Sequence, residues 1–347
     1  MAITTSRTAS NWNNQLMLNP DGGDIFQTRE IAEVKRRSGW KPYFFKTSDG
    51  LAMTVHEKSF PFLGKLWYIP RGPGVSTTDQ LPAILDDLKN YAREHHKRVF
   101  AIKIEPSLLE TEENIATLNK LGLVKSRAIQ PNHSTVLIDL TPSLDEILAS
   151  LNQKGRHAIR RAERDGVTAK PVDCTEKNMR AMYDLLRVTA EGKFNTRTYE
   201  YYREYWLAFA KNGTGQLFFA YFNGEIVAGA YAMYLGDNGT YKDGASIRKR
   251  TAYGASHLLQ WEVIKWMKSR GITSHDLCGV PHSTRLLDES DPFYGLGRFK
   301  TSFNKHVTDY VGGYDLIIKP TIYKLWISLG ERIAIRFDSI VRHRYWY

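Results

Sequence analysis

A lysine set among aromatic and glycine residues is the most suggestive chemical feature of this sequence. Lys300 lies between Phe299 and Phe303, and Gly295-Leu296-Gly297 precedes them. A Gly-Leu-Gly turn would let the backbone approach a ligand closely, and flanking rings would leave the ammonium charge poorly screened. Such a lysine can stabilise negative charge on an acyl carbonyl or on a tRNA phosphate. The alternative is an ordinary loop whose rings fill a core while Lys300 reaches water.

A second group of residues has the chemistry to bind phosphate. A guanidinium fork, an ammonium group and phenol hydroxyls together can surround a diphosphate. The sequence offers Lys35, Arg197, Tyr201 and Tyr241 for this purpose. Each has a structural alternative: Lys35 begins a charge run that could be solvated, Arg197 could be an exposed helix residue, and the tyrosines could be core aromatics.

Two further candidates stand beside prolines. Arg71 lies in Pro70-Arg71-Gly72-Pro73, which forms a turn whether or not it binds a ligand. Glu105 precedes Pro106 at the end of a predicted buried strand. Its carboxylate could serve as a general base, or the residue could merely end the strand.

Three arginines share one face of a predicted helix. Arg156, Arg160 and Arg164 are spaced four residues apart, so their side chains lie in one row. Such a row can bind the phosphates of a tRNA. A solvated surface is the alternative.

The elements that must position these residues alternate between strands and helices. The hydrophobic pattern predicts strands at 43–45, 52–57, 66–69, 99–104, 134–140, 217–222, 225–234, 241–245 and 275–278, and helices at 81–95, 115–121, 144–162, 179–191, 199–211 and 254–270. Gly155 interrupts the helix at 144–162, and Asn223-Gly224 is a strong hairpin signal. The repeated order of elements predicts a mixed α/β fold with two similar domains.

The domain boundary is placed near residue 145. We expect a first domain at 1–145 and a second domain at 146–316, with 317–347 completing the first. The strand at 134–140 is expected to close the first domain. With 347 residues, of which 42% are hydrophobic, the chain has enough apolar material for two cores.

Charge and cysteine content limit the class of protein. Lys and Arg number 48 against 37 acidic residues, so the formal net charge is +11, which favours polyanionic partners. Cys174 and Cys278 are the only cysteines and are too far apart for a disulfide framework or a common zinc site. No signal peptide or membrane-spanning run is recognisable, and no metal site is expected. These features predict a cytoplasmic protein.

Several stretches, in this order along the chain, resemble the motifs of the Fem family of peptidoglycan-bridge aminoacyltransferases. They are Val34-Lys35 with Gly39-Trp40, the Tyr68–Pro73 loop, Lys103–Pro106, the basic helix at 153–167, Phe194–Tyr202, and the Gly295–Phe303 segment. The matched stretches run from about Ile25 to Tyr323. Order along the chain makes the resemblance far stronger than any one motif.

The resemblance implies a fold and an activity. The fold would be two acetyltransferase-like (GNAT-type) domains, without the coiled-coil arm of some relatives because no long charged insertion follows 199–211. The donor would be an aminoacyl-tRNA, and the acceptor a muramyl-pentapeptide precursor that is either nucleotide-linked or lipid-linked. The product would be part of an interpeptide bridge. Since the acyl ester is already activated, no cofactor is implied.

The resemblance also implies residue roles. Lys35 and Arg197 would bind the phosphates of the precursor, with Tyr201 and Tyr241 alongside and Arg71 in a substrate-binding loop. Two further residues would serve the chemistry. Lys300 would stabilise the tetrahedral intermediate or the tRNA end, and Glu105 would lie near the acceptor amine, although the family pattern has aspartate there.

Two other classes of function remain open. One is an acetyl-CoA-dependent N-acyltransferase of a small amine, for which 250–255 is the nearest candidate pyrophosphate loop, with the wrong spacing. The other is a non-catalytic module that binds RNA or membranes, which the charge and the basic, apolar tail at 324–347 favour. That tail could lie on the membrane surface as a peripheral contact, or could pack on a domain.

Overall fold

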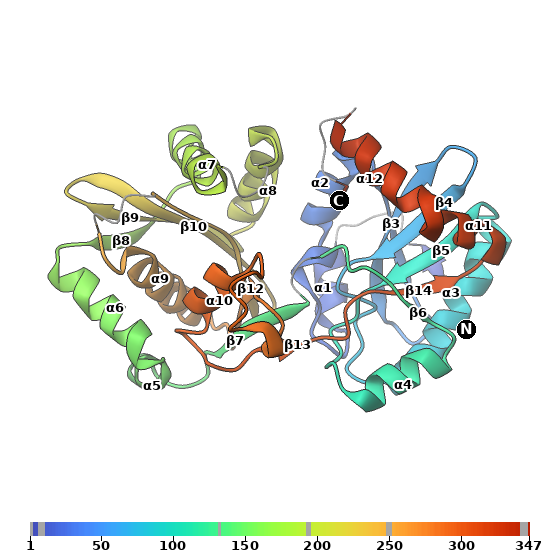
Figure 1. Ribbon diagram of the computed structural model, residues 1–347, viewed down its shortest axis with the longest axis horizontal. Coiled ribbons are helices and arrows are strands. Elements are labelled where there is room, and N and C mark those ends of the chain that lie inside the picture. Colours follow the sequence, from blue (N-terminus) through green and yellow to red (C-terminus); the bar gives the residue numbers. More distant parts are fainter. Residues whose placement is uncertain (1–2, 6–10, 131–132, 192–195, 248–251, 341–345) are drawn as a thin grey trace. The chain divides into compact units, whose positions relative to one another are not determined.

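The chain forms two compact units (Figure 1). The computed structural model describes residues 1–347 except 1–2, 6–10, 131–132, 192–195, 248–251 and 341–345, and the side chains of 339–340. Phe194 and Asn195 of the family motif, and the start of the candidate pyrophosphate loop, lie outside the described residues. One unit comprises Met1–His133 with Tyr310–Tyr347, and the other comprises Ser134–Asp309. The boundaries predicted from the sequence, at 145 and 316, differ from these.

The first unit is built on a seven-stranded mixed sheet. Its strand order is β1-β2-β3-β4-β5-β14-β6, in which β4 and β5 are parallel and the other pairs antiparallel. The strands are β1 (Thr4–Thr5), β2 (Lys41–Lys46), β3 (Ala52–Phe60), β4 (Gly64–Ile69), β5 (Val99–Ile104), β6 (Val124–Lys125) and β14 (Tyr314–Ile317). The helices of this unit are α1 (Trp12–Met17), α2 (Arg29–Arg37), α3 (Leu81–His95), α4 (Glu112–Lys120), α11 (Pro320–Leu325) and α12 (Glu331–Ile340).

The helix α3 covers the core of this sheet as its periodicity predicts. Leu81, Ile84, Leu85, Leu88 and Ala92 are all buried, since positions three and four apart share one face. All six residues of β5 are buried, which fits a central strand that is covered on both faces.

The end of the chain completes the first sheet. The strand β14 lies between β5 and β6, and Trp326 in the π-helical turn Trp326–Gly330 packs on Phe60 and Phe100. The tail therefore packs on the first unit. The chain re-enters this unit before residue 317, which was the predicted start of the C-terminal segment that completes the first domain.

The second unit holds the other mixed sheet. Its strand order is β13-β7-β12-β11-β10-β9-β8. The strands are β7 (Ser134–Asp139), β8 (Thr168–Val172), β9 (Gly215–Phe222), β10 (Glu225–Leu235), β11 (Asn238–Ser246), β12 (Ser274–Gly279) and β13 (Thr308–Asp309). The assignment of β7 to the first domain was wrong, because β7 pairs with β12 and β13. The hairpin at Asn223-Gly224 is confirmed, with both residues at positive φ.

Helices cover the faces of this second sheet. They are α5 (Leu144–Ser150), α6 (Gln153–Arg164), α7 (Glu176–Ala190), α8 (Tyr199–Lys211), α9 (Ala255–Ser269) and α10 (Tyr294–Lys300). The described residues contain no coiled-coil arm. Within the described part of the chain, no helix is both long enough and apolar enough to cross a membrane.

The break in the predicted helix at 144–162 falls at Asn152 instead of Gly155. The Asn152 side chain accepts a hydrogen bond from the Lys154 backbone N–H (3.2 Å) and so begins α6. Gly155 lies inside α6, where an added Cβ would be 2.4 Å from the carbonyl oxygen of Ser302. The same carbonyl accepts a hydrogen bond from the Asn152 backbone N–H (3.1 Å). The glycine thus permits α6 to contact the segment after Lys300.

We predict that Gly155→Ala destabilises the protein although alanine is the better helix former. The clash with a backbone oxygen should cost about 1–3 kcal/mol, against a gain of at most about 1 kcal/mol in helix propensity. Gly295→Ala in α10 is the matched control, because nothing lies within 4 Å of its added Cβ. Thermal unfolding should show a lower Tm for Gly155→Ala alone; equal Tm values for the two variants would contradict this packing.

Candidate functional site

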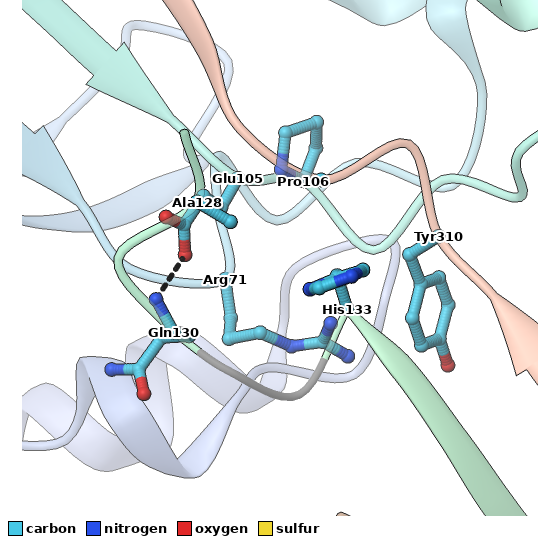
Figure 2. Close-up of a pocket in the computed structure, with 8 residues that line it drawn as sticks. Arg71, Glu105, Pro106, Ala128, Gln130, His133 and Tyr310 are labelled. Atoms are coloured by element: carbon cyan, nitrogen blue, oxygen red, sulfur yellow. Dashed lines mark hydrogen bonds between the residues drawn. The ribbon is translucent and has the colours of Figure 1, made fainter. Parts of the chain in front are cut away.

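A pocket in the first unit brings together Arg71 and Glu105, two of the predicted site residues. It has about 200 Å³ of empty volume, including its open mouth. The lining residues are Arg71, Glu105, Pro106, Ala128, Gln130, His133, Tyr310 and Gly312. Figure 2 shows the Arg71 side chain extending below His133 toward Tyr310.

Glu105 is buried and is held by donors from two segments. Tyr68 Oη donates to Oε2 (2.7 Å), the Gln130 backbone N–H donates to the same oxygen (3.3 Å), and the Ile129 backbone N–H donates to Oε1. Burial raises the pKa of Glu105, while these hydrogen bonds and Lys103 oppose the rise. The carboxyl group therefore fixes one wall of the pocket by binding the backbone at residues 129–130.

Arg71 lies in a left-handed turn, with φ of 49°. Its Nε donates to Asp24 Oδ2 (3.3 Å), and its guanidinium carbon lies 4.4 Å from the centre of the Tyr310 ring. A planar guanidinium stacked on an aromatic ring is well oriented to bind an anionic group. The turn expected from the sequence thus places a buried cation in the pocket wall.

Lys35 is buried, in contrast to the exposed Arg36 and Arg37 that follow it in α2. Its side chain is 4% exposed, and Nζ lies 3.8 Å above the ring of Tyr347. The Tyr347 ring also contacts Trp40 and Tyr68, with ring centres 5.3 Å and 4.8 Å away. The solvated charge run offered as an alternative is therefore wrong for Lys35 itself.

In the second unit, the loop before α8 places Arg197 on Tyr201. The guanidinium carbon lies 4.4 Å from the ring centre, and the Arg197 carbonyl accepts a hydrogen bond from Tyr183 Oη (3.0 Å). Arg197 is half-buried. Arg197, which the resemblance names as a phosphate ligand, thus neighbours Tyr201, which was expected alongside it.

A bulge in β11 adds two charged residues that the sequence analysis missed. The pairing between β10 and β11 shifts at Lys242, so that Tyr231 faces Asp243 and Ala232 faces Tyr241. Asp243 accepts hydrogen bonds from Tyr205 Oη and from Trp206 Nε1 (3.0 Å). The signal that would have revealed this pair is a Lys-Asp dipeptide within a strand of a buried sheet.

Burial changes the proton affinity of both residues in this bulge. It raises the pKa of Asp243 to about 8, against the opposing charge of Arg197. It also lowers the pKa of Lys242 to about 8, and Arg197 lowers it further while Cys278 opposes the change. Lys242 Nζ lies 3.8 Å from Asp243 Oδ1. Arg197, Lys242 and Asp243 therefore form one electrostatic cluster.

Lys300 ends α10 and is 6% exposed. Its Nζ donates to the Gly279 carbonyl at the end of β12 (2.8 Å). Burial lowers the pKa of Lys300, while the neighbouring Cys278 thiol and Asp276 carboxylate oppose the change. The alternative in which the Lys300 side chain reaches water is therefore wrong.

The aromatic residues beside Lys300 do not enclose it. Phe299 and Phe303 instead pack around His257 of α9, with ring centres 4.9 Å and 5.5 Å from the imidazole. The preceding Gly-Leu-Gly segment is helical, so the expected turn there is wrong. An added Cβ at Gly297 would lie 2.8 Å from Pro281 Cδ, which shows that this glycine serves packing.

Tyr241 and Cys278 lie near each other in the second sheet. Burial raises the pKa of Tyr241, and the neighbouring Cys278 adds to that effect. Cys278 has a φ of 61°, and its backbone N–H donates to Asp276 Oδ1 (2.5 Å). The same cysteine interacts electrostatically with Lys242 and Lys300. Cys278, which the sequence analysis assigned no role, thus stands among the predicted site residues.

The arginine row on α6 is divided. Arg156 Nη1 donates to the carbonyls of Ala149 (2.6 Å) and Leu151, so it secures the link between α5 and α6. Arg160 and Arg164 are exposed. Of the three arginines predicted to bind tRNA phosphates, Arg160 and Arg164 are therefore the accessible ones.

The predicted residues fall into one group per unit. Arg71 and Glu105 share the pocket, and Lys35 lies over Tyr347, whose ring contacts the Tyr68 that binds Glu105. Arg197, Tyr201, Tyr241 and Lys300 belong to the second unit. Among the described residues, no group of three or more His, Cys, Asp or Glu side chains is placed to hold a metal ion.

Comparisons with known proteins agree with this architecture. A family model described as an acetyltransferase (GNAT) domain matches residues 150–289. The chain is 24% identical to a lipid II:glycine glycyltransferase of Staphylococcus aureus, over 90% of this chain and 92% of the relative.

Solved structures show the same fold. The crystal structure of FemX matches with a TM-score of 0.81 and 21% identity, over 94% of this chain and 99% of that one. The C-terminal domain of a putative lysylphosphatidylglycerol synthetase from Agrobacterium fabrum matches with a TM-score of 0.52 and 15% identity, over 94% and 98% of the two chains. The predicted mixed α/β fold and the resemblance to the Fem family are confirmed.

We predict that Asp243 makes stability depend on pH. Because its pKa is raised from 3.8 to about 8, the folded protein binds more protons than the unfolded chain in this window. The stabilisation is complete below 3.8 and is lost as the pH rises through about 8. Lys242, with a lowered pKa of about 8, acts in the opposite direction only between about 8 and 10.5.

The test compares thermal unfolding of wild type and Asp243→Asn across this pH range. Wild-type Tm should fall more steeply with rising pH than that of Asp243→Asn. Asp139→Asn is the control, since Asp139 is exposed and its pKa is lowered. Parallel Tm curves for wild type and Asp243→Asn would show that Asp243 is ionised throughout.

Proposed function

We propose that this protein is an aminoacyltransferase that moves an amino acid from an aminoacyl-tRNA to the stem-peptide amine of a peptidoglycan precursor, building interpeptide bridges. The likeness over nine-tenths of the chain to a lipid II:glycine glycyltransferase carries the proposal. The buried cations at the motif positions support it, because a phosphate-bearing acceptor and a developing oxyanion both need fixed positive charge.

Residues at positions that resemble the acceptor-binding positions of the Fem family would contact the acceptor. Lys35 and Arg197, with Tyr201 and Tyr241 beside them, would bind the precursor's phosphates. Lys35 and Arg197 are already oriented by aromatic rings, so less side-chain freedom would be lost on binding. Arg71 would bind an anionic group of the same acceptor at the pocket wall. Lys242 would add positive charge beside Arg197.

The transfer itself needs one bond made and one broken. The unprotonated acceptor amine attacks the ester carbonyl, the new C–N bond forms, and the C–O bond to the tRNA ribose breaks. The amine proton leaves with the ribose oxygen. Lys300 would stabilise the negative charge that develops on the carbonyl oxygen.

Glu105 would act mainly by shaping the acceptor pocket. Both of its oxygens already accept hydrogen bonds from the protein, which secure the segment at residues 129–130. We therefore assign Glu105 a positioning role, in place of the general-base role that the resemblance suggested.

The same resemblance suggests how the donor tRNA is bound, which substrates to test first and where the reaction takes place. Arg160 and Arg164 would contact tRNA phosphates, since both are exposed on one helix. Glycine is the first amino acid to test, and a lipid-linked precursor the first acceptor, because the relative's name specifies both. Such a reaction would take place in the cytoplasm, at the membrane surface if the acceptor carries a lipid.

A second candidate function is transfer of an acyl group from acetyl-CoA to a small amine. The match of the acetyltransferase domain model at residues 150–289 favours it. This alternative requires no tRNA and no phosphate-bearing acceptor. It therefore serves as the competing outcome in the assay below.

We predict that the purified protein transfers an amino acid from charged tRNA to a muramyl-pentapeptide precursor. Lipid-linked and nucleotide-linked acceptors, each with a panel of charged tRNAs, are analysed by mass spectrometry. The expected product is heavier by one aminoacyl residue. Acetylation from acetyl-CoA together with no transfer from any charged tRNA would overturn the proposal.

We predict separate defects for Lys300→Ala and Arg197→Ala. Lys300→Ala should lower kcat by about a hundredfold or more, as expected for loss of an oxyanion stabiliser, with precursor affinity retained. Arg197→Ala should weaken precursor binding by about tenfold or more, since a charge-assisted contact is lost. Arg203→Ala is the control, because Arg203 pairs with Glu176 on the exposed side of α8. Calorimetry and single-turnover kinetics measure the two effects, and equal precursor affinity for wild type and Arg197→Ala would refute the assignment.

A further inference from the structure

The C-terminal helices carry an apolar row on their exposed side. Leu325, Leu329, Ile333 and Phe337 are spaced four residues apart along α11, the π-helical turn and α12. Their exposed fractions lie between 47% and 60%. Four-residue spacing keeps them on one side of the helical segment, which Figure 1 draws in red. The row is therefore a continuous apolar strip.

The adjacent row of Trp326, Gly330, Ala334 and Asp338, and not this strip, faces the sheet. Trp326 is 1% exposed and packs on Phe60 of β3, and Asp338 pairs with the buried Lys58. A helix on a purely aqueous surface normally carries polar residues on the outer side. The exposed strip thus calls for an apolar partner.

The tip of the β3–β4 hairpin extends this apolar surface. Leu63 packs against Gly330 of the π-helical turn, which places the hairpin beside the strip. Phe62, which precedes Leu63 at the hairpin tip, is 99% exposed and has a φ of 64°. A bulky residue in the left-handed region costs energy, so a fully exposed phenylalanine there gains nothing from folding.

Cations border the strip. Lys324, Arg332 and Arg336 are exposed, and each precedes a member of the strip by one residue. The acidic residues within 319–338 are Glu331, which is half-buried, and Asp338, which is buried against Lys58. The outer side of the segment is consequently apolar and positively charged.

We propose that this C-terminal face, made of Leu325, Leu329, Ile333, Phe337 and Phe62 with Lys324, Arg332 and Arg336, docks on an anionic lipid surface. The apolar side chains enter the headgroup region, and the three cations contact lipid phosphates. RNA would use the cations but not the aliphatic strip, and a second copy would bring like charges together. The inference does not depend on the transfer reaction.

Sedimentation with lipid vesicles tests the proposal, with no precursor or tRNA present. Wild type should bind phosphatidylglycerol/phosphatidylcholine vesicles and bind pure phosphatidylcholine far less. Leu329→Ser/Ile333→Ser/Phe337→Ser should lose about tenfold or more in vesicle affinity. Leu287→Ser is the control, since Leu287 is an exposed leucine of the second unit.

A charge-reversal set tests the electrostatic part. Lys324→Glu/Arg332→Glu/Arg336→Glu should abolish the preference for phosphatidylglycerol. Lys120→Glu/Lys177→Glu/Lys211→Glu changes the net charge equally at exposed positions elsewhere and should retain the preference. Phe62→Ser provides a variant whose folding is not at risk, because that side chain is exposed; it should weaken binding as well.

Three results would overturn the proposal. The first is wild-type affinity for vesicles that is equal to that of the triple serine variant. The second is a concentration-dependent dimer that the serine variant dissociates, measured by light scattering, which would assign the strip to a second copy. The third is loss of tRNA binding, with vesicle binding unchanged, in the charge-reversal variant. The first two results leave the proposed aminoacyl transfer untouched, so failure of the lipid proposal is distinguishable from failure of the proposed function.

Discussion

Burial of charged side chains is the constraint on which the candidate site depends. Lys35, Lys300 and Asp243 are removed from water, and each has a compensating neighbour. Lys35 lies over an aromatic ring, Lys300 donates to a backbone carbonyl, and Asp243 accepts from a hydroxyl and an indole N–H. Such compensation fixes the position of the charge. Burial itself shifts the proton affinity of Lys300 and Asp243 away from ordinary values. The two sheets thus hold ionisable groups in fixed positions that solvated side chains would not keep.

Close packing against neighbouring helices also fixes the segment that carries Lys300. The carbonyl of Ser302, two residues beyond Lys300, contacts α6 at Gly155 and Asn152, and Phe303 packs on His257. Lys300 is therefore positioned by a helix distant in sequence. The aromatic residues of the motif support the lysine indirectly, through the core, instead of surrounding it.

The motifs supplied the residues of the candidate site but not their surroundings. Lys35, Arg71 and Glu105 were named because they lie in stretches that resemble the motifs of the Fem family. Lys242 and Tyr347 were not found, because a bulge in β11 and the return of the chain end to α2 bring them into place. The strand β7 was misassigned for the same reason, since its partners lie more than a hundred residues further along the chain.

The sequence by itself determined the alternation of strands and helices, the apolar faces, the hairpin at Asn223-Gly224 and the order of the family motifs. These depend on side-chain types at local spacings, which the chain carries before it folds. Tertiary structure decided which sheet β7 joins, that Lys35 and Lys300 are buried, and that Arg156 is occupied by backbone carbonyls. Burial and pairing depend on contacts between residues that are distant in the chain, and local patterns do not specify those contacts.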